Sequence, residues 1–154
     1  MSSIPNLEIR TFRDEDLDQV IAIEEASFPD PYTKPLFWFL KLWAGDGFIV
    51  AKKGGIVGYA ISEIRRGRAH VISMAVSPDS RRAGIGESLV RELINRLSPK
   101  ADEFYLEVRP SNDAAIQLYE KFSFRKTGRV KKRYYPDGED ALIMVRPSEP
   151  PQRE

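Results

Sequence analysis

Two glycines and two arginines at the start of a predicted helix carry the clearest chemical signal in this 154-residue sequence. Residues 76–86 read VSPDSRRAGIG, so an apolar stretch ends, a short turn follows and a helical pattern begins at the glycines. Glycine allows a tight turn and a close approach of the backbone to a ligand. The first turn of a helix adds unpaired N–H groups and the positive end of the helix dipole. Together these features predict a cradle for a diphosphate. The alternative is a plain glycine-rich connector with two solvated arginines.

The spacing of the glycines excludes two common phosphate-binding motifs. The P-loop pattern GxxxxGK[ST] and its lysine are absent, and Leu89 stands where a dinucleotide-binding fingerprint has its third glycine. The pattern R/Q-x-x-G-x-G/A, present as RRAGIG at residues 81–86, resembles the acetyl-CoA pyrophosphate loop of the GNAT acetyltransferases. In that family consecutive backbone amides hold the pyrophosphate, which agrees with the physical interpretation.

Three further segments resemble the same family in their order and spacing. They are residues 106–112 (LEVRPSN), 115–122 (AIQLYEKF) and 134–141 (YYPDGEDA). They are similar to the branch that acetylates protein N-termini, which includes ribosomal-protein-alanine acetyltransferases and archaeal N-terminal acetyltransferases. The resemblance covers residues 7–146. It implies direct transfer of an acetyl group from acetyl-CoA to the free α-amino group of a protein or peptide, within a ternary complex.

Glu107 is the first candidate for the catalytic base. An amine attacks a thioester only when it is neutral. An α-amino group, with a pKa of about 7.7–8.0, is neutral far more often at physiological pH than a lysine at about 10.4, so a modest base suffices. Glu107 lies in an apolar strand, and we expect partial burial to raise its pKa toward a useful range. The resemblance implies the same role; the alternative is a structural ion pair with Arg109 or another arginine.

His70 and Tyr119 are the other catalytic candidates. His70, the only histidine, begins the strand that leads into the glycine loop. A lone histidine is usually a packed or surface residue, but related enzymes use a histidine or tyrosine at this position with ordered water. The strands of His70 and Glu107 are expected neighbours, although two ligands are too few to predict a metal. For Tyr119 the resemblance implies a phenol that protonates the departing CoA thiolate, whereas the pattern alone indicates a core aromatic.

The resemblance also implies which residues contact the two substrates. Pantetheine is expected to pair along an open strand edge like an added strand. The contacts expected for acetyl-CoA are Met74, Ala75, Val76, Arg81, Arg82, Ala83, Gly84, Ile85, Gly86, Glu87, Asn112, Tyr119, Glu120 and Lys121. The peptide is expected between Tyr32 on an early loop and Tyr134 with Tyr135 on a late hairpin, because their hydroxyls can bond its backbone. The alternative for Tyr134 and Tyr135 is that they only cap the hairpin.

Two positions depart from the family pattern. Some archaeal relatives have a glutamate that contributes to activity near the position of Asp30, and the shorter side chain here leaves that role open. Ser123 stands where the family usually has glycine. We expect this second change to be structurally neutral.

Composition narrows the class of protein. The chain has 42% hydrophobic and 31% charged residues and a net charge of +1, so it resembles one ordinary globular domain and gives no bulk electrostatic case for nucleic acid or membrane. It has no cysteine, which excludes disulfides, Cys-ligated zinc and acyl transfer through an enzyme thiol. Without a signal peptide or an apolar run of about 18 residues, a cytoplasmic location is expected.

The elements that must position these residues follow an α/β (α+β) order. Hydrophobic periodicity predicts strands over residues 7–12, 48–52, 56–64, 70–76, 103–108, 125–131 and 141–145, and helices over 14–28, 33–43, 85–97 and from 112 onward. This order predicts a mixed, mostly antiparallel sheet of about seven strands flanked by about four helices. The family resemblance implies that this is the GNAT fold. One domain is expected over residues 1–146, with a disordered tail at 147–154. The aromatic side chains of the second helix are expected in the core and the groove wall.

Three classes of function are compatible with these features. The leading one is an N-terminal acetyltransferase, whose partners are protein or peptide N-termini with the ribosome or nascent chains as further candidates. A second is an acetyltransferase for lysine or a small-molecule amine. A third is a non-catalytic acyl-CoA-binding or ribosome-associated module, with the basic runs at 65–68 and 129–133 on RNA. No membrane and no direct nucleic-acid contact is expected for the leading class.

Overall fold

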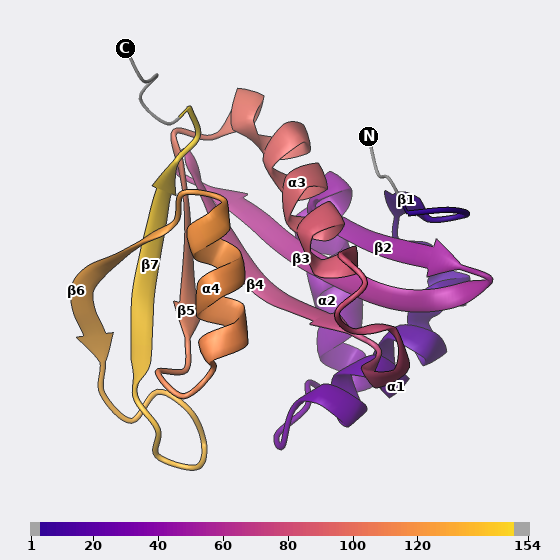
Figure 1. Ribbon diagram of the computed structural model, residues 1–154, viewed down its shortest axis with the longest axis horizontal. Coiled ribbons are helices and arrows are strands. Elements are labelled where there is room, and N and C mark those ends of the chain that lie inside the picture. The colour runs from indigo at the N-terminus through magenta and orange to yellow at the C-terminus, as the bar shows by residue number, and fades with distance from the viewer. Residues whose placement is uncertain (1–3, 150–154) are drawn as a thin grey trace.

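One seven-stranded sheet with helices on both faces forms the described part of the chain, residues 4–149 of a computed structural model (Figure 1). The strand order is β1-β2-β3-β4-β5-β7-β6, and β4–β5 is the one parallel pair in it. The strands are β1 (Glu8–Thr11), β2 (Phe48–Lys53), β3 (Gly55–Arg65), β4 (Arg68–Val76), β5 (Glu103–Val108), β6 (Arg125–Lys131) and β7 (Ala141–Pro147). The helices are α1 (Leu17–Ser27), α2 (Lys34–Ala44), α3 (Ile85–Leu97) and α4 (Asp113–Lys121). The predicted fold is confirmed.

The two faces of the sheet carry separate apolar cores. Helices α3 and α4 cover the face nearer the viewer in Figure 1, and α1 with α2 covers the other face. Strand β2 shows why, because successive side chains of a strand point to opposite faces. Phe48 and Val50 pack on the α1–α2 side, whereas Ile49 and Ala51 pack on the α3–α4 side. A central strand covered on both faces is therefore apolar throughout this stretch.

Strands β4 and β5 pair only over part of their length. The parallel register runs from Arg68 opposite Glu103 to Val71 opposite Leu106, and β4 then continues alone to Val76 (Figure 1). The Ser77 N–H donates to the Val57 carbonyl at 2.8 Å, which fixes the alternation of main-chain groups along β4. The N–H and C=O groups of residues 74 and 76 therefore point away from β3, toward the edge where β5 has separated. This gives the open strand edge that the sequence predicts.

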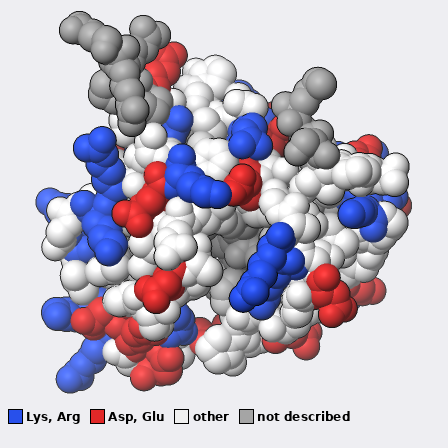
Figure 2. All heavy atoms as spheres, viewed as in Figure 1, with Lys and Arg blue, Asp and Glu red and all other residues white. Residues whose placement is uncertain are grey.

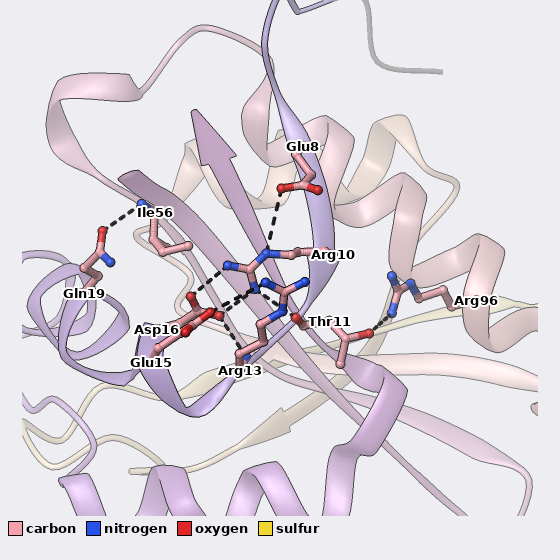
Figure 3. Close-up of polar contacts among 9 residues, drawn as sticks. All are labelled: Glu8, Arg10, Thr11, Arg13, Glu15, Asp16, Gln19, Ile56 and Arg96. Atoms are coloured by element: carbon pink, nitrogen blue, oxygen red, sulfur yellow. Dashed lines mark hydrogen bonds and ion pairs between the residues drawn. The ribbon is translucent and has the colours of Figure 1, made fainter. Parts of the chain in front are cut away.

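A buried ion pair fastens β1 to the start of α1 (Figure 3). Arg10 donates from Nη1 to Asp16 Oδ2 at 2.7 Å and from Nη2 to Oδ1 at 2.9 Å, and the Arg13 N–H adds a bond at 2.8 Å. Burial raises the pKa of Asp16, but the hydrogen bonds from Arg10 and Arg13 outweigh it and hold that pKa below its ordinary value. The contact stabilises the N-terminal edge of the sheet and lies outside the opening between β4 and β5.

The expectation for the aromatic side chains of α2 is wrong for three of the four. Phe37 is fully buried, whereas Trp38, Phe39 and Trp43 are exposed, the last to 61%. An 11-residue helix lying on a sheet presents only one stripe to it, and here Phe37 and Leu40 fill that stripe. The aromatic residues on the other sides of α2 remain at the surface.

Ser123 is not structurally neutral. Its φ is +69°, in the left-handed region that disfavours side chains. The N–H groups of Ser123 and Phe124 donate to the carbonyls of Glu120 and Tyr119, each at 3.1 Å, which is the Schellman ending of a helix. The left-handed residue of that motif is normally glycine, so the serine carries a conformational cost that the sequence pattern did not reveal.

The C-terminal boundary lies later than residue 146. Strand β7 continues through Pro147, and the Ser148 N–H donates to the Asp102 carbonyl at 3.0 Å. The rest of the expected tail, residues 150–154, lies outside the described residues. Within residues 4–149, no helix combines the length and the apolar character needed to cross a bilayer.

Candidate active site

The glycine loop ends on the first turn of α3. Gly84 is the N-cap, with φ +83°, and its carbonyl accepts the first helical bond from the Ser88 N–H at 3.1 Å. The N–H groups of residues 85–87 precede that bond and have no acceptor within the helix. A Cβ on Gly86 would lie 3.3 Å from Leu118 Cδ2. Glycine is thus favoured by backbone conformation at one position and by the close packing of α3 on α4 at the other.

The two arginines of the loop differ in what they contact. Arg81 donates from Nε to the Val76 carbonyl at 3.0 Å and from Nη2 to Ser27 Oγ at 3.1 Å, so it ties the loop to β4 and α1. Arg82 has φ +65°, is exposed and has no polar partner within residues 4–149. The sequence treats the pair alike, but Arg82 is the one free to meet an anion. The Val76 carbonyl, expected to face pantetheine, already accepts a bond.

The surface beside this loop suits a phosphorylated coenzyme. Figure 2 shows that the face covered by α3 and α4 is hollowed near its centre, with Lys or Arg side chains beside the hollow. Unpaired N–H groups at the start of a helix and a guanidinium without a partner among the described residues are groups that bind a diphosphate. The predicted contacts of the loop therefore fit acetyl-CoA.

The predicted coenzyme contacts on α4 have partners within the protein. Asn112 caps the helix by accepting the Ala115 N–H at 3.1 Å, as the sequence indicates. Lys121 Nζ lies 2.6 Å from Glu87 Oε1, and this hydrogen bond holds the pKa of Glu87 below its ordinary value. Glu87 on α3 and Lys121 on α4, both expected to contact the coenzyme, are thus bonded to each other. Glu120, the third expected contact near the end of α4, is exposed.

His70 and Glu107 meet where β4 and β5 lie side by side. His70 Nε2 is 2.6 Å from Glu107 Oε1, and the imidazole stacks on the Tyr105 ring with 4.5 Å between centroids. The Glu107 side chain is 6% exposed, and that of His70 is more open. The two side chains are in direct contact, as their expected position on neighbouring strands implies. An ionised carboxylate only accepts, so the imidazole donates from Nε2 and keeps Nδ1 for another partner.

Lys131 is a third member of this cluster that the sequence did not single out. Its Nζ donates to Glu107 Oε2 at 3.0 Å and lies 5.2 Å from the centre of the Tyr134 ring. In the sequence it is one of five residues in a basic run, and nothing local distinguishes it. Only the pairing of β6 with β7, and of β7 with β5, brings it to the carboxylate.

The expected direction of the Glu107 pKa shift is wrong. Burial does raise it, but the hydrogen bonds and charges of His70 and Lys131 together outweigh burial, so the pKa of Glu107 lies below its ordinary value. The alternative of an ion pair with Arg109 is also wrong, because the partners are an imidazole and a lysine. Glu107 is therefore ionised at neutral pH.

The three candidate substrate tyrosines surround this carboxylate. Burial raises the pKa of Tyr32 to about 12 and also raises those of Tyr134 and Tyr135, and the charge of Glu107 contributes to all three. The rings of Tyr134 and Tyr135 pack edge to face with 5.0 Å between centroids. All three phenols are thus neutral hydrogen-bond donors near the carboxylate.

Arg109 joins the early loop to the late hairpin. Its Nη1 donates to Asp137 at 2.8 Å and to Glu139 at 2.9 Å, and its Nη2 lies 3.5 Å from Asp30. The guanidinium also lies 4.0 Å from the centre of the Tyr135 ring. Asp30, whose role the sequence leaves open, is therefore held by an arginine that the sequence names only as a possible partner of Glu107.

Tyr119 is packed in the core and still reaches the surface. Its ring lies edge to face with Phe124 at 5.4 Å, and burial raises its pKa to about 12. The hydroxyl has no hydrogen-bond partner within residues 4–149, yet no buried polar side-chain atom in that range lacks one. The hydroxyl therefore keeps at least a small opening and an unused donor for a ligand, although the residue as a whole is only 8% exposed.

Comparison with known proteins agrees with these features. The model of the acetyltransferase (GNAT) family matches residues 17–124. The N-alpha-acetyltransferase of Sulfolobus acidocaldarius is 36% identical, covering 92% of this chain and 93% of its own. The ribosomal protein bS18-alanine N-acetyltransferase of Escherichia coli K12 is 33% identical, covering 96% and 98%. The crystal structure of Ard1 from Thermoplasma volcanium aligns with a TM-score of 0.88 and 30% identity, covering 92% of this chain and 97% of that one.

Proposed function

This chain belongs to the GNAT family of acetyltransferases, and on that premise we propose that it acetylates the free α-amino group of proteins or peptides. Acetyl-CoA is the acetyl donor that the family uses. The observation that carries the proposal is the cluster at the β4–β5 separation, where an ionised carboxylate and an imidazole lie among three neutral tyrosines. Such a site attracts an ammonium, takes its proton and bonds the adjoining peptide backbone.

The donor would bind along β4 and over the start of α3. The main-chain groups of Met74 and the N–H of Val76 face the open edge, where pantetheine amides can pair as an added strand would. The unpaired N–H groups of residues 85–87 and the guanidinium of Arg82 would receive the diphosphate. This arrangement leads the thioester toward His70, because that residue lies on the same strand as Met74.

The His70–Glu107 pair would accept the proton of the incoming amine. An incoming ammonium first gives one proton to this pair and so becomes a neutral nucleophile. The amine nitrogen then attacks the carbonyl carbon of the thioester, the carbon–sulfur bond breaks to release CoA as the thiolate, and the nitrogen loses a second proton to solvent or to that thiolate. Because Glu107 has a lowered pKa, it serves to attract the ammonium and to orient the ring. Imidazole is the side chain best suited to carry a proton near neutral pH. We therefore assign the two residues to one base, with Nδ1 of His70 as the atom that receives the proton directly or through water.

Tyr119 would stabilise the leaving group by a hydrogen bond. A phenol with a pKa of about 12 holds its proton more firmly than an ordinary thiol at about 8.5. Complete transfer to the CoA thiolate is then uphill, whereas donation of a hydrogen bond to the sulfur is favourable. The proposed role is thus milder than the protonation that the family resemblance implies.

The acceptor pocket already holds a cation of the expected kind. The ammonium of Lys131 sits between the Glu107 carboxylate and the Tyr134 ring, and both groups stabilise a positive amine. An α-ammonium that enters beside Tyr32 would find the same surroundings. The peptide that follows it would lie between the early loop and the late hairpin, which Arg109 holds together.

We propose nascent or ribosome-associated chains in the cytoplasm as the source of these N-termini. The name of the Escherichia coli relative, which acts on a ribosomal protein, supports this choice. The alternative acceptors are a lysine side chain or a small-molecule amine. A module that binds acyl-CoA without turnover is the remaining alternative.

Acetyl transfer to matched peptides tests the proposal. Each peptide carries one internal lysine and has either a free or a blocked N-terminus. We expect mass spectrometry to find one acetyl group, on the α-nitrogen of the free peptide only. Equal labelling of the blocked peptide would favour the lysine alternative, and acetyl-CoA binding without turnover on any amine would favour the module.

A further inference from the structure

A second buried carboxylate, Glu24, lies outside the proposed chemistry. It is on α1 and is 2% exposed. Its Oε2 accepts the Tyr32 N–H at 2.9 Å, and its Oε1 accepts the hydroxyls of Tyr59 and, at 3.5 Å, Ser73. Every described contact of this carboxylate is therefore a hydrogen bond from a neutral donor.

These donors come from three different parts of the site. Tyr59 is on β3 and fully buried, and Ser73 is on β4, immediately before Met74 on the edge proposed for pantetheine. Tyr32 belongs to the loop between α1 and α2 and is one of the proposed acceptor walls. Glu24 thus connects the wall of the acceptor pocket to the strand that carries the donor.

The network provides hydrogen-bond donors to both oxygens of the Glu24 side chain. Burial and the charge of Glu24 raise the pKa of Tyr59, so this phenol keeps its proton and donates it. A buried carboxylate is costly unless its oxygens receive such bonds. The same rule makes the Tyr32 N–H dependent on Glu24, since a main-chain donor turned into the protein needs an acceptor.

The bond to Tyr32 is made by the main chain, so it sets the course of the loop itself. The ring of Tyr32 then packs edge to face on Phe37, with 6.2 Å between centroids. Two attachments, one to Glu24 and one to α2, hold the Tyr32 residue, and its phenol lies near enough to Glu107 for that charge to raise its pKa. Loss of the first frees the loop while the apolar contact remains.

We propose that Glu24 is a positioning residue that holds Tyr32 as the acceptor wall, an inference that rests on the proposed acetylation of peptide amines. It acts through the loop and touches neither substrate. Its removal should weaken peptide capture while leaving the handling of acetyl-CoA intact.

Steady-state kinetics on Glu24→Ala and Glu24→Gln test this role. For Glu24→Ala we expect the peptide KM to rise about tenfold, with the acetyl-CoA KM within about twofold of wild type. Glu24→Gln should recover most of the loss, because the amide oxygen still accepts the Tyr32 N–H. Glu25→Ala, the matched change at the next and exposed position of α1, should behave as wild type.

Two kinetic outcomes would overturn the proposal. One is an unchanged peptide KM in Glu24→Ala. The other is a fall in kcat with an altered pH profile in Glu24→Gln, since that pattern would make the carboxylate itself part of the chemistry. If Glu24→Ala does not fold, Glu24→Met, which fills the space without offering an acceptor, should still raise the peptide KM. Tyr59→Phe retains the acceptor for Tyr32 and should keep the wild-type value, so equal peptide KM values in the two variants would overturn the proposal.

Hydrogen exchange separates this inference from the proposed function. Without any substrate, the segment of residues 28–33 should exchange faster in Glu24→Ala than in wild type, Glu24→Gln or Glu25→Ala. Unchanged exchange in Glu24→Ala would show that the loop does not depend on the carboxylate. A wild-type protein that acetylates no peptide would refute the proposed function and leave the exchange result standing.

Discussion

Two nearly buried carboxylates, Asp16 and Glu107, look alike by burial and differ in their partners. Their side chains are 3% and 6% exposed, and both have a pKa below the ordinary value. Asp16 accepts a bidentate pair of hydrogen bonds from the Arg10 guanidinium, which stays charged at all relevant pH values (Figure 3). Glu107 receives an imidazole from one strand and a flexible ammonium from another. Burial and a lowered pKa therefore do not by themselves distinguish the proposed catalytic carboxylate from a structural one; the kind of partner does.

The surroundings of the two carboxylates reinforce this difference. Asp16 joins β1 to α1 at the edge of the sheet, where its contacts are all to neighbouring protein groups. Glu107 lies where β4 and β5 separate, with Tyr32, Tyr134 and Tyr135 near it. We therefore expect changes at Asp16 to act on the free energy of unfolding and changes at Glu107 to act on the reaction.

The largest effect is expected for Glu107→Gln. The amide keeps the shape but cannot attract an ammonium or orient the imidazolium, so kcat/KM should fall by about 100-fold or more. Thermal unfolding should move less than in Asp16→Asn, because the amide oxygen can still accept from Lys131 while the amide NH2 donates to the other tautomer of the His70 imidazole. Peptide acetylation assays and calorimetry on the same samples check both halves. A loss of activity below threefold would remove Glu107 from the proposed base.

The reverse pattern is expected for Asp16→Asn. The variant should lose about 2 kcal/mol of unfolding free energy, the usual scale for charged hydrogen bonds, while the activity of the folded protein stays near wild type. Because the folded pKa of Asp16 is depressed, its stabilisation is present above the unfolded value of about 3.9 and is lost as the pH falls through the folded value. Urea unfolding should show a smaller difference in unfolding free energy between Asp16→Asn and wild type below pH 4 than at neutral pH.

A neighbouring carboxylate provides the control for Asp16. Glu15 is exposed and lies 3.6 Å from Arg13 in a surface ion pair. Glu15→Gln should change the unfolding free energy by less than about 1 kcal/mol. An equal loss in both variants would mean that the charge of this turn, rather than the buried fork, accounts for the effect.

A smaller effect is expected for Lys131→Met. Several groups face Glu107 from the elements around it: His70, Lys131, Tyr32, Tyr134 and Tyr135. Removal of the ammonium takes away one of the causes that lower the Glu107 pKa, so the acid limb of kcat/KM should move to higher pH. The change at neutral pH should be several-fold at most. Lys132→Met is the matched control, because Lys132 is exposed and bonds to Asp140 instead. Coincident profiles for wild type and both variants would exclude Lys131 from the control of this carboxylate.

What the sequence predicts well is local along the chain. The glycine loop, the helix that starts near residue 112 and the strand over residues 103–108 each depend on neighbouring residues, and the structure has them where the sequence places them. The meeting of His70 with Glu107 follows from one expected strand neighbour. The direction of the Glu107 pKa could not be predicted in the same way. It depends on Lys131, which reaches the site through two successive strand pairings.

Other features depend on geometry that residue types do not report. Arg109 and Asp30 meet because the loop before α2 lies against the end of β5, 79 residues away in the sequence (109 − 30). The side of α2 that faces the sheet is likewise fixed by packing, since apolar residues occur all around that helix. The positive φ of Ser123 is visible only once the helix ending is known.

The smallest expected effect lies at the end of α4, the helix that carries Tyr119. Here a substitution should increase the free energy of unfolding, whereas Asp16→Asn should decrease it, and the activity should again stay unchanged. Ser123→Gly removes a left-handed side chain that costs about 1–2 kcal/mol, and part of the gain is lost to the greater freedom of unfolded glycine, so a net gain of about 0.5–1 kcal/mol is expected. Ala114→Gly, on the exposed side of the same helix, should lose about 1 kcal/mol. Both variants should keep the wild-type kcat/KM, because neither change touches the proposed site. If the melting temperature shifted in the same direction in both variants, α4 would not end in the conformation described. Only at a left-handed position does a change to glycine raise the melting temperature, whereas within the helix it lowers it.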